Sequence, residues 1–92
     1  ARASLQTARL RMDGLLRKHG MPSPTGTLLF RTVQHPRAAD IADQLARRGI
    51  LVRRFDAPAA LRFGLPPDET GWQRLEGALS ELTYLIDHPH PG

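Results

Sequence analysis

Two arginines in the second half of the chain are the residues best suited to chemistry. Arg53 follows the apolar run 50–52, and Arg62 lies in the segment 61–65, where apolar residues alternate with Arg62 and Gly64. Alternation with a period of two predicts a strand with one apolar face. A guanidinium fork binds carboxylate or phosphate through two parallel hydrogen bonds, a geometry that lysine cannot copy. The arginines are therefore the candidates for contact with an anion.

The residues alone allow two interpretations of Arg62. An arginine held in a strand is costly to bury unpaired, so it needs an anion from a ligand or from a neighbour. Gly64, on the same face, would let a ligand approach the backbone. The competing interpretation is an edge-strand arginine that faces water, with an Asp or Glu partner, because most arginines lie at the surface. The sequence pattern leaves both interpretations open.

No other group of reactive residues stands out in the sequence. The chain has no cysteine, and its one lysine, Lys18, falls in the last turn of a predicted helix, where it is expected to be solvated. His88 and His90 form an H-x-H pair in the terminal segment 87–92, which we expect to be loose rather than metal-binding. No serine has the context of a catalytic nucleophile. We therefore predict no catalytic residue and no metal site.

Length and charge limit the class of protein. The 92 residues carry a net charge of +4 and fit one small domain. The arginine excess permits nucleic-acid binding, but no RNP-like string accompanies it. No apolar run is long enough to cross a membrane. The chain starts at Ala1 without an initiator Met or an apolar targeting segment, so we expect a cytoplasmic piece of a longer chain, without nucleic-acid or membrane partners.

Apolar periodicity predicts three helices and three strands. The helices are expected at 3–19, 37–48 and 69–86, and the strands at 27–33, 50–55 and 60–65. The most regular signal is the spacing of Trp72, Leu75, Leu79, Leu82 and Ile86, which predicts a helix packed on a sheet. Residues 21–26 are expected to form a loop. The order α-β-α-β-β-α predicts an α+β fold, a small open sheet of three or four mainly antiparallel strands covered by helices.

Four strings, in this order, carry a resemblance to a known family. They are Thr-Leu-Leu-Phe-Arg (27–31), Gly-Ile-Leu-Val-Arg-Arg-Phe (49–55), Leu-Arg-Phe-Gly-Leu-Pro (61–66) and Trp-Gln-Arg-Leu-Glu-Gly-Ala-Leu (72–79). The chain resembles the C-terminal small domain of fold-type I pyridoxal-phosphate enzymes of the histidinol-phosphate aminotransferase type. Within that group it is most similar to the threonine-phosphate decarboxylase branch of cobalamin biosynthesis. The resemblance extends from the first helix to about residue 86.

The resemblance implies a division of labour between two domains. A large domain, outside these 92 residues, would hold pyridoxal phosphate through a Schiff-base lysine, and Lys18 does not match that motif. The small domain, residues 1–92, would bind the anionic ends of an amino-acid or amino-phosphate substrate. Arg62 would take the α-carboxylate and Arg53 the phosphate, whereas Arg54 faces the opposite way on a strand and is left unassigned. The parent enzyme is expected to be a homodimer, and this piece alone to be inactive and free of cofactor.

Three alternatives remain beside this interpretation. The parent could be an aminotransferase of the histidinol-phosphate type, because the strings are less specific for the reaction than for the superfamily. A free-standing α+β regulatory module that binds a small anionic metabolite is a hypothesis of a different class. A basic nucleic-acid binder is the third, and steep salt-dependent binding to oligonucleotides would support it.

Overall fold

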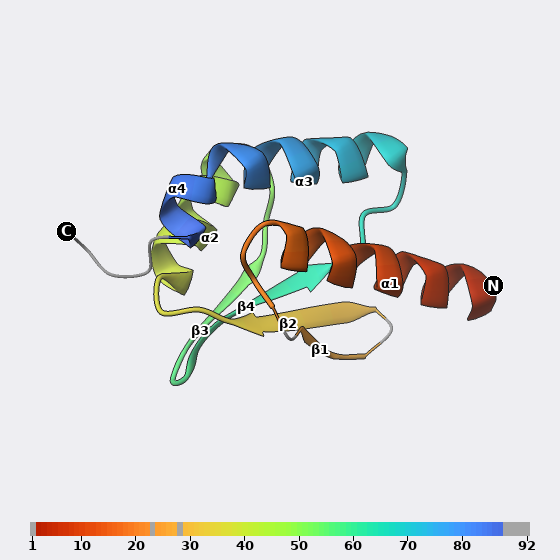
Figure 1. Ribbon diagram of the computed structural model, residues 1–92, viewed down its shortest axis with the longest axis horizontal. Helices are drawn as coiled ribbons and strands as arrows, with labels where there is room; N and C mark the ends of the chain where they lie inside the picture. Colours follow the sequence, from red (N-terminus) through yellow and green to blue (C-terminus); the bar gives the residue numbers. More distant parts are fainter. Residues whose placement is uncertain (1, 23, 28, 88–92) are drawn as a thin grey trace.

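The computed structural model describes residues 2–22, 24–27 and 29–87, with side chains from Leu5 onward. The elements are α1 (Arg2–Lys18), β1 (Thr25–Gly26), β2 (Phe30–Gln34), α2 (Ala38–Arg47), β3 (Arg53–Asp56), β4 (Ala59–Gly64), α3 (Glu69–Glu81) and α4 (Thr83–Ile86). The strands form one sheet in the order β1-β2-β4-β3, with every pair antiparallel (Figure 1). The predicted α+β class and open antiparallel sheet are confirmed.

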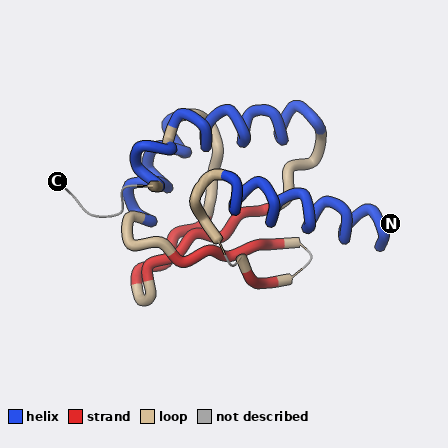
Figure 2. The backbone as a smooth tube through the Cα atoms, in the orientation of Figure 1, coloured by secondary structure: helices blue, strands red, loops and turns tan. Residues whose placement is uncertain are grey.

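The helices lie on one side of the sheet and leave its other face open (Figure 2). Side chains of β2 and β4 supply the sheet's share of the core with Val33, Leu61 and Phe63, each at most 1% exposed. The helices cover them with a buried apolar set: Met12, Leu16, Ile41, Leu45, Trp72, Leu75, Leu79, Leu82, Leu85 and Ile86. Burial of apolar area on this one side is the main stabilising term of the fold.

The last predicted helix exists but is divided in two. Asp68 caps α3, since its side chain accepts a hydrogen bond of 2.9 Å from the Gly71 N–H. The prediction of one helix to Ile86 is wrong, because α3 ends at Glu81 and α4 begins at Thr83. The Thr83 hydroxyl donates to the Leu79 carbonyl (3.3 Å), and side-chain bonds of this kind compete with the helical backbone. The apolar stripe nevertheless stays buried through both helices.

Two strands begin later than predicted, for local reasons. The Thr27 hydroxyl accepts hydrogen bonds from the N–H groups of Leu29 and Phe30, so the chain turns there and β2 starts only at Phe30. Leu28, which the prediction placed in this strand, lies outside the described residues. At the end of α2, the Ile50 N–H donates to the Leu45 carbonyl across Gly49, whose φ is +80°, and β3 starts only at Arg53.

A fourth strand lies inside the segment predicted to be a loop. Thr25 and Gly26 pair with Thr32 and Arg31, and this two-residue β1 forms an edge of the sheet. A run of two residues is too short to show any alternation, so periodicity could not reveal it. In the part of the chain that the structure describes, no helix combines the length and the apolar character needed to cross a bilayer.

Candidate anion-binding face

Arg53 and Arg62 lie side by side on the open face of the sheet. They are direct partners across β3 and β4, and Arg62 is in turn opposite Thr32 of β2, which is opposite Thr25 of β1. Residues directly opposite each other on neighbouring strands point to the same face. Arg54 is opposite the buried Leu61, so it points to the other face, as its position next to Arg53 predicted.

Aromatic rings, rather than carboxylates, surround the two guanidinium groups. The Arg62 guanidinium carbon lies 4.7 Å from the centroid of Phe30 and 5.8 Å from that of Phe55. The Arg53 guanidinium carbon lies 5.6 Å from the same Phe55 centroid. Arg62 is partly buried and Arg53 is exposed. Both cations thus share one ring, and both are close enough to the solvent to meet a ligand.

The absence of a counter-charge separates these two arginines from most others. Among the described residues, seven arginines lie within ion-pair distance of a carboxylate, namely Arg9, Arg11, Arg31, Arg37, Arg47, Arg48 and Arg54. Within that same part of the chain, neither Arg53 nor Arg62 has such a partner. This agrees with the interpretation of Arg62 as an arginine available to an anion and not with the alternative of a paired edge-strand residue.

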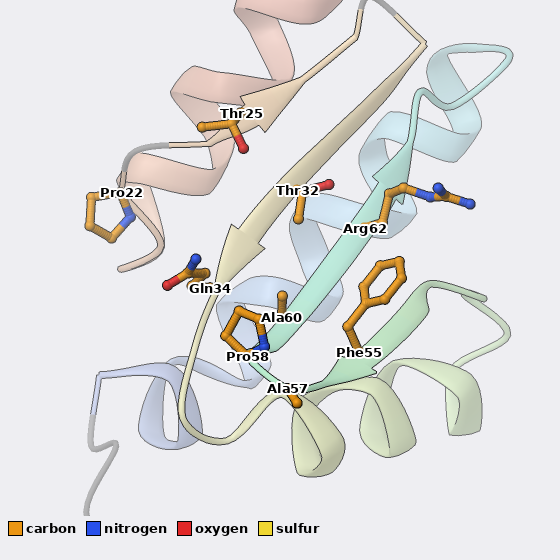
Figure 3. Close-up of a pocket in the computed structure, with 9 residues that line it drawn as sticks. All are labelled: Pro22, Thr25, Thr32, Gln34, Phe55, Ala57, Pro58, Ala60 and Arg62. Carbon is orange, nitrogen blue, oxygen red and sulfur yellow. The ribbon is translucent and has the colours of Figure 1, made fainter.

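A shallow hollow of about 530 Å³ adjoins Arg62 on this face (Figure 3). Arg62 and Phe55 lie at one end of it, and Pro22 and Thr25 lie at the other. The remaining lining residues are Thr32, Gln34, Ala57, Pro58 and Ala60. The hollow thus combines one cation with the hydroxyls of Thr25 and Thr32 and the Gln34 amide, groups that can bind an anion but cannot transfer a proton near neutral pH.

Arg31, one residue before Thr32, has a structural role that was not predicted from the sequence: it forms a buried ion pair with Asp13. Its side chain is buried, and its Nε and Nη2 donate to the two carboxylate oxygens of Asp13 at 2.8 and 3.2 Å. Further donors reach the carbonyls of Pro24, Gly26 and Thr27. The guanidinium therefore joins α1, the segment around β1, and β2. The sequence signal for burial of Arg31 is weak. It consists only of the alternation that puts Arg31 on the same face as the buried Val33, whereas Thr32 lies on the open face.

The other chemically interesting side chains do not join this face. Lys18 Nζ lies 2.8 Å from Glu76 on the helical side and is 65% exposed, which confirms the expected surface position. His35 is buried, with Nε2 2.8 Å from the Ile86 carbonyl and Nδ1 accepting from the Arg37 N–H. The residues that the structure describes contain no metal-ligating cluster of His, Cys, Asp and Glu, and His88 and His90 lie outside them.

Comparison with known proteins finds two relatives, and this chain is similar to a part of each. The chain is 52% identical over 75 residues to a threonine-phosphate decarboxylase of Pseudomonas aeruginosa, and 42% identical over 81 residues to one of a Sinorhizobium species. The chain resembles a segment of threonine-phosphate decarboxylase. The matches cover 82% and 87% of this chain, and they confirm the resemblance expected from the four strings.

The matched region is a small part of each of these decarboxylases. The chain spans about a quarter of their length, 23% of the first and 24% of the second. No protein-family model matches the chain. The open face with Arg53 and Arg62 therefore belongs to a chain that matches only part of those longer proteins.

Proposed function

We propose that the chain is the C-terminal, substrate-binding small domain of a pyridoxal-phosphate-dependent threonine-phosphate decarboxylase of cobalamin biosynthesis. The observation that carries the proposal is the pair Arg53 and Arg62, adjacent on an open sheet face without a carboxylate partner among the described residues. The 52% identity to a threonine-phosphate decarboxylase supports the choice of reaction. As in enzymes of this type, the parent would be a cytoplasmic homodimer.

In this proposal, each arginine takes one anionic group of the substrate. Arg62 binds the α-carboxylate, and Arg53 binds the phosphate. The two groups sit on neighbouring carbons of threonine phosphate, and neighbouring strands lie about 5 Å apart. Two arginines opposite each other on β3 and β4 therefore match a small molecule with two anionic ends better than a molecule with one.

The residues of this chain do not fit the cofactor itself. Lys18, the one lysine of the sequence, is engaged with Glu76 on the helical side, away from the open face. Pyridoxal phosphate, bound by the remainder of the parent protein, would supply the electron sink for the reaction. The contribution of this chain is orientation. Clamping the carboxylate fixes which bond to the α-carbon is held in the reactive direction, so Arg62 affects the reaction through position.

The test is turnover of threonine phosphate by the full-length parent protein. We expect Arg62→Lys to lower kcat/KM about 10- to 100-fold, because lysine keeps the charge but loses a bidentate contact to a charged group. The unfolding midpoint should stay nearly constant, since Arg62 has no ion pair to lose among the described residues. Arg54→Lys is the matched control: it is the next residue to Arg53, points to the other face, and should retain activity.

Two results would contradict the proposal. Unchanged kinetics for Arg62→Lys would remove the assigned role of that residue. Turnover of an amino donor without release of carbon dioxide would replace the decarboxylase with an aminotransferase of the histidinol-phosphate type, while leaving the anion-binding face in place.

A further inference from the structure

The two rings beside Arg62 come from the strands on either side of it. Phe30 lies on β2 and Phe55 on β3, whereas Arg62 lies on β4 between them. Each ring is a diagonal neighbour, because Phe30 is opposite Gly64 and Phe55 is opposite Ala60. Diagonal neighbours on one face are within reach of aromatic and long side chains. The guanidinium therefore lies between two aromatic residues that approach it from opposite sides.

Small residues on β4 make room for these rings. Ala60 and Gly64 flank Arg62 on the same face, and each is opposite one of the two phenylalanines. A Cβ added to Gly64 would lie 3.8 and 3.9 Å from two atoms of the Phe30 ring, which is van der Waals contact. The Phe30 ring thus lies against the bare backbone of Gly64. On β4, Arg62 thus lies between two small residues, and each small residue is opposite a phenylalanine on a neighbouring strand.

A ring holds a guanidinium in a different way from a carboxylate. The negative face of the ring attracts the cation, yet it occupies none of the five N–H donors in the way a carboxylate does. An Asp or Glu at either position would place a competing anion beside the fork. Phe30 is 43% exposed, so burial in the core does not explain why a phenylalanine occupies this position. The contact of its ring with the Arg62 guanidinium offers an explanation.

We propose that Phe30 and Phe55 are positioning residues that hold the Arg62 fork ready for the substrate carboxylate while leaving its donors free. This inference rests on the proposed function, because it assigns Arg62 to the carboxylate. Phe55 has a second effect, since it also contacts Arg53 and so couples the two cations.

The experiment uses the full-length protein and variants that remove or keep each ring. Phe30→Leu and Phe55→Leu should each lower kcat/KM for threonine phosphate about 3- to 10-fold, mainly through KM, because the free arginine then samples more rotamers. Phe30→Tyr and Phe55→Tyr keep the ring and should restore the value. Leu51→Ala is the control for loss of an exposed apolar side chain, as Leu51 is 86% exposed, and it should leave kcat/KM unchanged.

Two further measurements separate positioning from a general effect on folding. In an Arg62→Lys background, Phe30→Leu should cause little additional loss, because among the described residues the cation that this ring contacts is Arg62. In protein labelled with 15N-arginine, the Nε–H signal that disappears in Arg62→Lys should show a ring-current shift in the wild type. That shift should decrease in each Leu variant and persist in each Tyr variant.

The outcomes distinguish this inference from the proposed function. If Arg62→Lys leaves turnover unchanged, both fail. If Arg62→Lys lowers turnover but the Leu variants match the wild type, or Phe30→Leu has its full effect in the Arg62→Lys background, the inference alone is overturned. A ring-current shift that is absent in the wild type would also overturn it.

Discussion

Arginine has a structural task on the helical face of this sheet and, in the proposed function, a binding task on the open face. Arg31 points to the helical side, where it is 5% exposed and hydrogen-bonded to Asp13. Arg62, one strand away, points to the open side and contacts rings. A buried charge must be paired because its desolvation is costly, whereas a half-exposed charge is still hydrated and can remain without a carboxylate partner. The environment, not the residue type, therefore decides which arginine stabilises the fold and which remains available.

The sequence predicted only one of these two tasks. Arg62 stood out because it alternates with apolar residues in a clear strand pattern and shares a face with Gly64. Arg31 also lies within a strand, but its partner Asp13 is 18 residues earlier on α1. No local pattern connects a helix residue with a strand residue across that distance. Exposure and pairing depend on which face of the sheet the helices cover, and a single sequence does not give that information.

Asp13 should be among the most sensitive polar positions of the chain. Asp13→Ala leaves the buried Arg31 without its carboxylate, so we expect a loss of about 3–5 kcal/mol in the free energy of unfolding. The double variant Asp13→Leu with Arg31→Met removes both charges and should recover much of that loss. Urea unfolding measures both. A double variant as unstable as Asp13→Ala would show that the carbonyls of Pro24, Gly26 and Thr27 depend on the guanidinium as much as Asp13 does.

At the scale of elements, periodicity predicted which segments form helices and strands, and capping determined where they end. The stripe of α3 is buried as its spacing required. The starts of β2 and β3 were missed because the Thr27 hydroxyl and the Ile50 N–H form local hydrogen bonds that delay each strand. Such bonds involve single residues and leave no periodic signal, so an apolar pattern alone extends each strand too far.

The apolar stripe of α3 should carry much of the stability. Leu79, on α3, is fully buried in the hydrophobic core. We expect Leu79→Ala to cost about 2–5 kcal/mol, because it removes buried methyl groups and leaves a cavity. Leu10→Ala is the matched control, since Leu10 is 60% exposed on α1, and its cost should stay below about 0.5 kcal/mol. Equal losses for the two in denaturant unfolding would show that the stripe does not form the core.

The contact between α1 and α3 should depend on pH. Arg11 donates to both carboxylate oxygens of Glu69 and lies 4.5 Å from the Trp72 centroid. The hydrogen bond from Arg11 is the main cause that lowers the pKa of Glu69 in the folded chain. A carboxylate with a lowered folded pKa stabilises the fold above its ordinary pKa, and that contribution is lost as the pH falls through the lowered value.

Glu69→Gln tests this dependence. The variant should be less stable than the wild type near neutral pH, and the difference should shrink on acidification, because protonated Glu69 and glutamine are then both neutral. The pair is exposed, so the difference should also decrease in high salt. Thermal unfolding midpoints at several pH values measure it. A difference that stays constant from neutral to acidic pH would show that the charge of Glu69 does not contribute to the contact.

At the scale of the whole molecule, the one-sided covering of the sheet leaves one face free for the substrate binding that we propose. The helices bury one face, and the open face has two cations, two rings and neutral polar groups. Within the described part of that face there is no carboxylate, imidazole or amine. Such a surface can bind and orient an anionic substrate, but it has no group that moves a proton at neutral pH.

The last prediction follows from that incompleteness and concerns the cofactor. Lys18 is the one lysine, and it is exposed and ion-paired with Glu76 on the helical side. Covalent attachment of pyridoxal phosphate needs an oriented, neutral amine in a dry pocket. An exposed lysine in an ion pair does not meet these requirements. We therefore expect the 92-residue chain, mixed with pyridoxal phosphate and then diluted, to retain no stoichiometric lysine adduct by absorbance or by mass after borohydride reduction. The full-length parent should retain one per chain under the same treatment. An adduct on the 92-residue chain that survives dilution and disappears in Lys18→Ala would assign cofactor binding to this segment and remove the division of labour on which the proposed function depends.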